Sequence, residues 1–247
     1  MNTSDLKGFR AAITGGSSGL GLALTRALHA RGASVAFVAR SEADVARVAR
    51  ELPGSHGIVG DVSLKDDTHR IALQIAGELG GLDLLINNAS SLGPTPLALL
   101  ADTECEEFEA AVATNLLGPF RLIKALLGSL ATSAREHASA QRSAVVINIS
   151  SDAAITPYAS WGAYASSKAA LHHMSRIWDI ELRAHGVRVM SIDPGDMDTP
   201  LHALAVPDAD PATLKRPSDC ARAIIDAALD VSGSRDAARA VDEGRNV

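Results

Sequence analysis

Short apolar runs alternate with longer amphipathic segments along the 247-residue chain. The apolar runs are almost unbroken stretches of Val, Ile, Leu and Ala, which is typical of strands buried on both faces of a parallel sheet. The strands that these runs predict are Arg10–Thr14, Ser34–Ala39, Gly57–Val59, Leu82–Asn87, Ala144–Ile149 and Val187–Ile192.

The segments between these runs have helical periodicity. After Leu20, apolar residues recur at one-turn spacing through Leu28, and Gly32 is suited to end the helix. Strand–helix units of about 30 residues indicate a doubly wound α/β fold, with helices on both faces of the sheet and right-handed crossovers. No stretch has the composition of a linker, so we expect residues 1–247 to form a single domain.

Two segments lack a clear pattern. Residues 132–142 are small and polar, and we expect them to extend a helix end into a loop. Residues 194–217 contain five prolines and no clear period. Irregular segments of this length in compact domains are usually functional lids or disordered, and we interpret this one as a substrate-covering loop.

Composition and charge exclude several classes of protein. The chain is 47% hydrophobic, 21% charged and only 3% aromatic, which predicts a globular protein with a large aliphatic core. The net charge is −6 and the basic residues are scattered, which argues against nucleic acid as a partner. We see neither an unbroken apolar run of about 18 residues nor a signal peptide, so we expect a cytoplasmic protein without a membrane span. Cys105 and Cys220 show no motif spacing and are interpreted as reduced thiols.

A glycine-rich turn follows the first predicted strand, with the sequence T-G-G-S-S-G-L-G over residues 14–21. Glycines at 15, 19 and 21 permit a tight turn and close approach of the backbone to a bulky anion. The N–H groups at the start of the following helix would then face a pyrophosphate, so the motif predicts dinucleotide binding. The alternative is an ordinary flexible turn between a strand and a helix.

The end of the second predicted strand bears on the choice of dinucleotide. NAD enzymes usually place an acidic residue there for the ribose 2′-hydroxyl. This chain has Ala39, Arg40 and Ser41, so no carboxylate repels a 2′-phosphate and a guanidinium is available to pair with one. The pattern favours NADP(H), whereas the alternative is a solvated arginine at the start of a helix.

One of the two tyrosines stands four residues before one of the five lysines. The surrounding residues 161–184 predict a helix, so Tyr164 and Lys168 share a face. A cation about 4 Å away can lower the ordinary tyrosine pKa of about 10 by up to roughly three units. The pair therefore predicts a tyrosine that acts as a general acid, and the alternative is a surface pair without a role.

Five motifs follow one another in order: the glycine turn of residues 14–21, N-N-A at 87–89, S-S at 150–151, Y-x-x-x-K at 164–168 and P-G at 194–195. With them the chain resembles the short-chain dehydrogenase/reductase family from about residue 8 to residue 230. The resemblance implies one Rossmann-type domain. Because the usual family ending is poorly matched by Arg239–Gly244, we expect six to seven strands.

The resemblance also implies catalytic roles. Ser151, thirteen residues before Tyr164, would bond the substrate carbonyl oxygen, and Tyr164 would transfer the proton. Lys168 would lower the tyrosine pKa and hold the nicotinamide ribose. Asn115 matches the asparagine that holds a water in the proton relay.

Further positions match the family's cofactor contacts. Asp61 and Val62 correspond to the pair beside adenine, Asn88 and Ala89 to the turn that lines the cofactor, and Thr199 to the threonine that binds the carboxamide. Each also has a simpler reading, as a turn residue or a helix cap. The complete set of expected cofactor contacts is Gly15, Ser17, Ser18, Gly19, Leu20, Gly21, Arg40, Ser41, Asp61, Val62, Asn88, Ala89, Tyr164, Lys168, Pro194, Gly195, Met197 and Thr199.

The chain departs from the family in two further places. Ser90 replaces the glycine of N-N-A-G, and a positive φ there would strain a serine. The glycine turn has Ser17 and Ser18 but lacks the basic residue common in NADP enzymes, so the NADP(H) prediction depends mainly on Arg40. Pro157, Tyr158 and Trp161 resemble the sepiapterin and benzil reductase branch, whose members often reduce dicarbonyls.

These observations favour an NADP(H)-dependent oxidoreductase that reduces a ketone, aldehyde or dicarbonyl to an alcohol. The alternatives are a non-catalytic NADP-binding regulatory protein, or an epimerase or dehydratase of the same fold, although such relatives tend to be longer. No metal motif occurs, so we expect no metal. The broad apolar faces predicted for residues 108–130 and 161–184 lead us to expect a homodimer or homotetramer, as in relatives.

Overall fold

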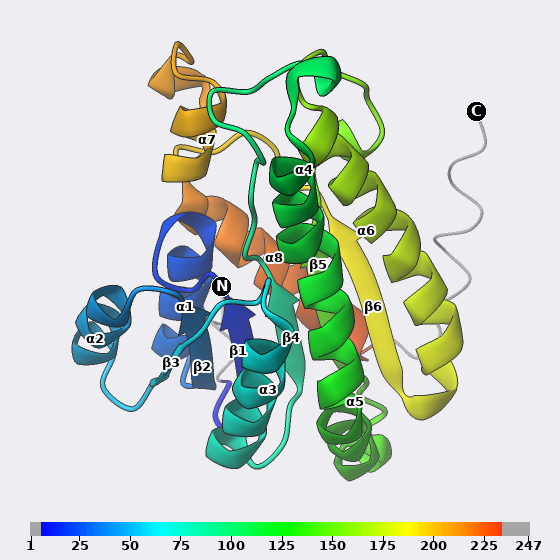
Figure 1. The fold of residues 1–247 in the computed structure, drawn as a ribbon. Coiled ribbons are helices and arrows are strands. Elements are labelled where there is room, and N and C mark those ends of the chain that lie inside the picture. Colours follow the sequence, from blue (N-terminus) through cyan, green and yellow to red (C-terminus); the bar gives the residue numbers. More distant parts are fainter. Residues whose placement is uncertain (1–5, 234–247) are drawn as a thin grey trace.

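A computed structural model describes residues 6–233 and contains one six-stranded parallel sheet. The strand order is β3-β2-β1-β4-β5-β6, which confirms the predicted doubly wound α/β fold (Figure 1). Successive strands are added toward one edge of the sheet up to β3 and toward the other edge from β4 on, so the strand order switches between β1 and β4. Open α/β sheets bind ligands at such switch points. The strands are β1 Arg10–Thr14, β2 Ser34–Ala39, β3 His56–Val59, β4 Leu84–Asn87, β5 Ala144–Ile149 and β6 Val187–Ile192.

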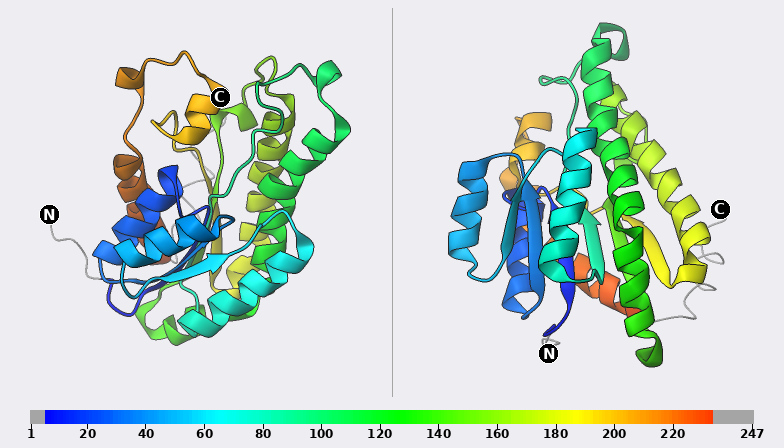
Figure 2. Two further views of the ribbon diagram at one scale, coloured as in Figure 1. Left: turned by 60° about the vertical axis from the view of Figure 1, so that its left-hand side comes forward. Right: turned by 60° about the horizontal axis from the view of Figure 1, so that its bottom comes forward.

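Helices cover both faces of the sheet, as Figure 2 shows. One aliphatic cluster joins the sheet to α1 and α8, and the side chain of Phe37 packs α2 onto the same face. A second cluster joins the opposite face to α3 and α5, with Leu182 of α6 included. The helices of these layers are α1 Gly19–Ala30, α2 Glu42–Glu51, α3 Lys65–Leu79, α5 Gly118–Glu136, α6 Gly162–Leu182 and α8 Pro217–Gly233.

The predicted strands differ from the observed ones at two ends. β3 begins one residue earlier than predicted, at His56, a polar residue that pairs with Ala36. β4 begins two residues later, because the Leu82 N–H donates to the Ser133 hydroxyl of α5 instead of to a neighbouring strand. The apolar run therefore identifies the buried residues correctly, but the strand is shorter than the run.

The helix predicted around residues 108–130 is part of a continuous helical run made of α4 Cys105–Val112, a π-helix Ala113–Leu117 and α5. By length and composition alone, the run Cys105–Glu136 qualifies as a candidate membrane span. Core helices of soluble proteins pass the same test, and Leu122 and Leu126 of α5 lie in the core beside α3. The run is therefore only weak support for a membrane span.

The proline-rich residues 194–217 are partly ordered into helices. Thr199 caps α7 Pro200–Ala205 by accepting a hydrogen bond from the His202 N–H, and a 3-10 helix follows at Pro211–Thr213. A parallel bridge between Met197 and Lys215 closes the base of the segment. In Figure 1, α7 stands beyond the same end of the sheet as the start of α4.

Two other predictions concern chain segments near helix ends. Residues 132–142 do extend a helix into a loop, because α5 ends at Glu136 and a 3-10 turn Ala138–Ala140 follows. The helix predicted over 161–184 is α6, continued by a 3-10 turn Arg183–His185. The segment Arg239–Gly244, which matches the usual family ending poorly, lies outside the described residues.

Candidate active site

A cleft of about 1210 Å³ opens at the carboxyl ends of the strands, beside the β1–β4 switch point. Its walls come from the glycine turn, the segments after β2 to β6, and α7. Of the predicted site residues, all line this cleft except Gly21, Ser41 and Asn115. The structure therefore brings residues from across the sequence into one hollow.

The glycine turn forms one end of the cleft. Gly15 and Gly19 have φ angles of 67° and 49°, in the region that favours glycine. Ser18, at the N-cap of α1, makes no side-chain capping bond, so its side chain leaves the first helical N–H groups free to face the cleft. Gly21 does not line the cleft, but a Cβ there would lie 2.0 Å from the Gly15 carbonyl oxygen. Gly21 therefore allows α1 to approach the turn.

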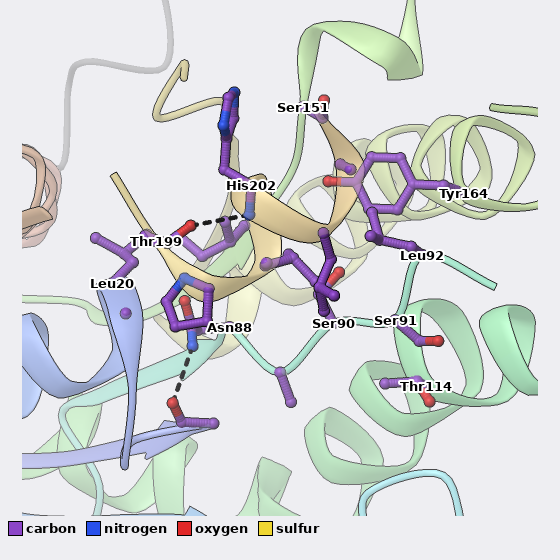
Figure 3. Close-up of a pocket in the computed structure, with 18 of the residues that line it drawn as sticks. Leu20, Asn88, Ser90, Ser91, Leu92, Thr114, Ser151, Tyr164, Thr199 and His202 are labelled. Carbon is purple, nitrogen blue, oxygen red and sulfur yellow. Dashed lines mark hydrogen bonds between the residues drawn. The ribbon is translucent and has the colours of Figure 1, made fainter. Parts of the chain in front are cut away.

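The segment after β4 holds the glycine turn in place. The Thr14 hydroxyl accepts hydrogen bonds from the N–H groups of Asn88 and Ala89, each at 3.0 Å. The Asn88 amide donates back to the Thr14 carbonyl at 2.9 Å. It also donates to the Gly15 carbonyl at 3.4 Å, which is the dashed line from Asn88 in Figure 3. In the neighbouring strand pair, the Asn87 amide donates to Asn148 at 2.8 Å. These bonds fix two adjacent walls of the cleft.

Arg40 lies at the open end of the cleft, where β2 ends, and its side chain is exposed. Ser41 does not line the cleft; its hydroxyl caps α2 by accepting from the Asp44 N–H at 3.2 Å. Asp61 lines the same end and shapes a turn by accepting from the Ser63 N–H at 2.9 Å, with Val62 buried beside it. This end of the cleft thus offers one exposed guanidinium and no carboxylate directly after β2.

Tyr164 and Ser151 lie at the other end of the cleft, where Figure 3 shows the Tyr164 hydroxyl turned toward Ser151. The tyrosine is 7% exposed. Burial raises its pKa to about 12, while hydrogen bonding to Ser151 and Ser90 opposes the rise and Asp193 and Asp152 add to it. The two predicted catalytic hydroxyls therefore line the same cleft, and Ser151 lies close enough to influence the pKa of Tyr164.

Lys168 lies beneath the tyrosine and is 2% exposed. Its Nζ is 5.5 Å from the centre of the Tyr164 ring and donates to the Ile149 carbonyl at 2.7 Å. Burial lowers the lysine pKa to about 8. In the protein alone the pKa of Tyr164 is thus raised, opposite to the direction expected from Lys168, and burial is the largest influence on it.

Asn115 lies in the π-helix, is 1% exposed and does not line the cleft. Its amide nitrogen donates to the Ser91 carbonyl at 2.7 Å and to the Ser167 hydroxyl at 2.8 Å. Its oxygen accepts from the Ser91 N–H at 2.8 Å and the Ser90 hydroxyl at 3.2 Å. The side chain is saturated, so it holds the cleft wall, and a water relay would have to use its main chain.

Ser90 does not have the strained backbone expected from its replacement of glycine. The positive-φ residues other than glycine, within residues 6–233, are Gln141 and Ser160. Ser90 instead uses its hydroxyl to bond Asn115 and to approach Tyr164. A side chain at this position therefore contributes polarity to the cleft, which the motif comparison did not indicate.

Asp152 and His202 are cleft residues that the sequence patterns did not single out. The Ser151 hydroxyl donates to Asp152 at 2.9 Å, and the Tyr158 hydroxyl donates to the other oxygen of the same carboxylate at 2.7 Å. The Nε2 atom of His202 lies 3.5 Å from an Asp196 oxygen. Neither residue belongs to a spaced motif, so only the folded chain identifies them.

The opposite wall near Tyr164 is apolar. Leu92 and Trp161 pack with Leu201 and Ala205 of α7 around the tyrosine. The Trp161 ring meets the Tyr164 ring edge to face, with centroids 5.7 Å apart. The Ser151 and Tyr164 hydroxyls therefore lie between an aliphatic and aromatic wall and a polar one.

The cleft fits a dinucleotide by its own geometry. A Cβ at Gly15 would lie 2.9 Å from the Asn88 amide nitrogen, and one at Gly19 would lie 3.3 Å from Thr199. The turn thus keeps side chains away from the start of α1, where N–H groups and the helix dipole favour a phosphate. Within residues 6–233, no group of His, Cys, Asp and Glu side chains is arranged to hold a metal ion.

Comparison with known proteins yields clear relatives. The family model described as short chain dehydrogenase matches residues 10–210. L-fucose dehydrogenase of Mus musculus is 34% identical over 200 residues, which cover 81% of this chain and 69% of that protein.

Solved structures share the fold over almost the whole chain. A 3-ketoacyl-(acyl-carrier-protein) reductase from Brucella melitensis complexed with NADH superposes with a TM-score of 0.81 at 25% identity, covering 93% of this chain and 99% of that one. A short chain dehydrogenase from Shigella flexneri complexed with NADP also has a TM-score of 0.81, at 27% identity, covering 96% and 95%. One neighbour carries NADH and the other NADP, so the likeness does not distinguish the two cofactors.

Proposed function

We propose that this chain, an NAD(P)-dependent oxidoreductase that belongs to the short-chain dehydrogenase family, uses NADP(H) to reduce a ketone, aldehyde or dicarbonyl to an alcohol. One observation carries the proposal: the Ser151 and Tyr164 hydroxyls and the Lys168 side chain share one cleft with the glycine turn. Each group has a distinct task in carbonyl reduction.

Ser151 orients the carbonyl oxygen and stabilises the negative charge that develops on it once the hydroxyl turns its one proton from Asp152 to that oxygen. Tyr164 keeps its proton at neutral pH because its pKa is about 12, and it donates that proton as the oxygen becomes basic. When bound, the nicotinamide supplies the hydride for the carbonyl carbon. The high tyrosine pKa thus suits the reduction direction.

Lys168 would return a proton to Tyr164 after the tyrosine has donated its own. Its pKa of about 8 leaves the side chain mostly protonated at neutral pH yet able to release a proton. It also lies within the cleft lining, where it would hold the ribose hydroxyls of the cofactor. The saturated side chain of Asn115 holds the Ser90–Ser91 wall during these steps.

Cofactor choice follows from the end of β2. Arg40 is exposed there and would pair with a 2′-phosphate, while Ala39 and Ser41 carry no charge that would repel it. The glycine turn would take the pyrophosphate, Asp61 and Val62 the adenine, and Asn88, Ala89, Gly195 and Thr199 the nicotinamide side. This arrangement supports NADP(H) over NAD(H).

The apolar wall supports a substrate with an uncharged body. Leu201 and Ala205 of α7 pack beside Trp161, so residues 194–217 would cover such a substrate. The position of Trp161 against Tyr164 also supports the likeness to dicarbonyl reductases. We place the enzyme in the cytoplasm as a homo-oligomer that pairs through α5 and α6, where Ile177 and Ile180 are exposed.

The test is cofactor oxidation by the purified protein with a panel of diketones, ketones and aldehydes, using NADPH and NADH in parallel. The proposal expects alcohol product in equal amount to the NADPH consumed. Binding of NADPH without turnover of any compound in the panel would instead support a cofactor-binding regulatory protein.

A further inference from the structure

Asp152 contacts the catalytic serine from within the cleft. The Ser151 hydroxyl donates to Asp152 Oδ1 at 2.9 Å, and the Ala153 N–H donates to the same atom at 2.8 Å. The hydroxyl of Tyr158, the second tyrosine of the chain, donates to Asp152 Oδ2 at 2.7 Å. The carboxylate is therefore held from both sides, one bond away from the predicted oxyanion donor.

The charge on Asp152 is present under ordinary conditions and reaches the reacting groups. The hydrogen bond from Tyr158 is the largest influence on its pKa and lowers it, and Ser151 and Ala153 act in the same direction against the cost of burial. The field of Asp152, together with that of Asp193, raises the pKa of Tyr164. A substrate whose carbonyl oxygen lies between Ser151 and Tyr164 thus has a carboxylate beside it.

Two of the other charged groups in this half of the cleft are carboxylates as well. Asp193 accepts from the Gly195 N–H at 2.8 Å, and Asp196 lies 3.5 Å from His202. Lys168 is buried under the tyrosine and bonded to Ile149. Facing this wall, Leu92 is aliphatic, and Trp161 has its indole N–H as its one side-chain donor.

We infer that Asp152 is a specificity-determining residue, which favours carbonyl substrates bearing a hydroxyl or another hydrogen-bond donor on the adjacent carbon and disfavours a carboxylate there. Asp152 is exposed to the cleft, as is Tyr158 at 45%, so a substituent next to the carbonyl can reach both. A donor on that substituent finds an acceptor in Asp152. A carboxylate at the same place meets a like charge, which is unfavourable.

This inference rests on the proposed function, because it refines the substrate class of the same cleft. Among the candidate substrates, it places 2-hydroxy ketones ahead of 2-keto acids and ahead of ketones with a plain methyl group. The preference follows from one carboxylate and one phenol, and both can be changed without altering the size of the side chain greatly.

Three ketones that differ only beside the carbonyl test the inference: acetophenone, 2-hydroxyacetophenone and phenylglyoxylate. Binding to the NADPH-loaded protein is measured through tryptophan fluorescence, since Trp161 lines the cleft, and turnover is measured in parallel through NADPH consumption. We expect the hydroxy ketone to bind roughly 10-fold more tightly than acetophenone and about 100-fold more tightly than phenylglyoxylate.

The variant Asp152→Asn keeps an acceptor for Ser151 and removes the charge. We expect it to shrink the gap between hydroxy ketone and phenylglyoxylate about 10-fold or more, and Tyr158→Phe to shrink it less. The matched control is Asp210→Asn, at an acid that lines the same cleft and whose side chain, among the hydrogen bonds described, accepts only from the Ala212 N–H. It should leave the ratio unchanged.

Equal binding of the three ketones, tightest binding of phenylglyoxylate, no binding of any of them, or a ratio that Asp152→Asn does not move would each overturn the inference. The expected binding ratios without any NADPH consumption would support the inference and overturn the proposed function instead. The two failures are therefore distinguishable in one set of measurements.

Discussion

The Nζ atom of Lys168 lies 5.5 Å from the centre of the Tyr164 ring and donates to the carbonyl of Ile149 at the end of β5. Burial favours the neutral form of each side chain, so it raises the tyrosine pKa to about 12 and lowers the lysine pKa to about 8. The pair is thus a protonated phenol over an easily deprotonated amine. Proton transfer to a carbonyl oxygen can begin from this arrangement without a prior ionisation of the tyrosine.

The lowered pKa of Lys168 predicts a pH-dependent stability. The unfolded lysine binds its proton up to about pH 10.5, whereas the folded one releases it above about pH 8, so the unfolded state holds more protons between these values. The free energy of unfolding should therefore rise across this window, by up to about 3 kcal/mol in total, relative to Lys168→Met. Denaturant unfolding of both proteins between pH 7 and 10 measures the difference. Parallel curves would contradict the lysine pKa.

The glycine turn leaves no room for a side chain at Gly21. A Cβ there would lie 2.0 Å from the Gly15 carbonyl oxygen and 2.5 Å from the Asn88 amide nitrogen, so the turn or α1 must move. We expect Gly21→Ala to lose NADPH binding and to destabilise the fold by about 3 kcal/mol, in the range of overpacking. Calorimetric titration and denaturant unfolding provide the two readouts.

Gly77→Ala is the matched control for the glycine turn. Gly77 lies within α3, and no heavy atom within 4 Å would meet its Cβ. Alanine favours helix, so this change should stabilise the protein by about 0.5–1 kcal/mol and leave binding intact. A Gly21→Ala variant that binds NADPH as the control does would show that the approach of α1 is not needed.

The exposed guanidinium of Arg40 leads us to expect a preference for NADP(H) over NAD(H). Replacing its guanidinium with a carboxylate removes the partner of a 2′-phosphate and adds a partner for a 2′-hydroxyl. We expect Arg40→Asp to change the NADPH-to-NADH ratio of kcat/KM by roughly 100-fold in favour of NADH.

Arg50→Asp makes the same change of charge on α2 as a control. Arg50 is exposed, bonds the Ala46 carbonyl of its own helix and does not line the cleft. The NADPH-to-NADH ratio of kcat/KM for Arg50→Asp should stay near that of the wild type. Similar shifts in both variants would mean that net charge, and not a contact at the end of β2, sets the preference.

We expect the Asn115 side chain to matter more for the stability of the fold than for a proton relay. Its side chain makes four hydrogen bonds to Ser90, Ser91 and Ser167 in a buried site. Asn115→Ala leaves these partners unsatisfied and should lower the free energy of unfolding by about 3 kcal/mol. Thr103→Val, which removes an exposed bond to the Leu99 carbonyl, is the control and should change stability little. Lost activity in a fully stable Asn115→Ala would instead support a relay through the side chain.

Most of the fold was accessible from the sequence because buried parallel strands leave unbroken apolar runs. The runs at Arg10–Thr14, Ser34–Ala39, Ala144–Ile149 and Val187–Ile192 match the observed strands at both ends. His56 was missed because a polar residue at the start of an edge strand gives no apolar signal. The helix α7 was missed because six residues are too few for a period, although Thr199 and Pro200 are a capping residue and a favoured first residue.

The candidate site was only partly accessible from the sequence. Motifs located Ser151, Tyr164 and Lys168, whose spacing along one strand end and one helix brings them together. The direction of the tyrosine pKa was predicted wrongly, because burial depends on the α7 segment and the Trp161 wall and cannot be read from four-residue spacing. The contributions of Asp152 and Ser90 to the site come from hydrogen bonds between side chains, and such bonds leave no pattern in the sequence.

The most direct test of the account compares the wild type with Tyr164→Phe in both NADPH binding and NADPH consumption, using a ketone that the wild type reduces. Phenylalanine keeps the ring that packs on Trp161 and removes the hydroxyl beside Ser151. The account predicts NADPH binding within about threefold of the wild type and a fall in kcat of roughly 100-fold or more, the range of general acid catalysis. Turnover by Tyr164→Phe at a rate near that of the wild type would contradict the role of this hydroxyl as the proton donor.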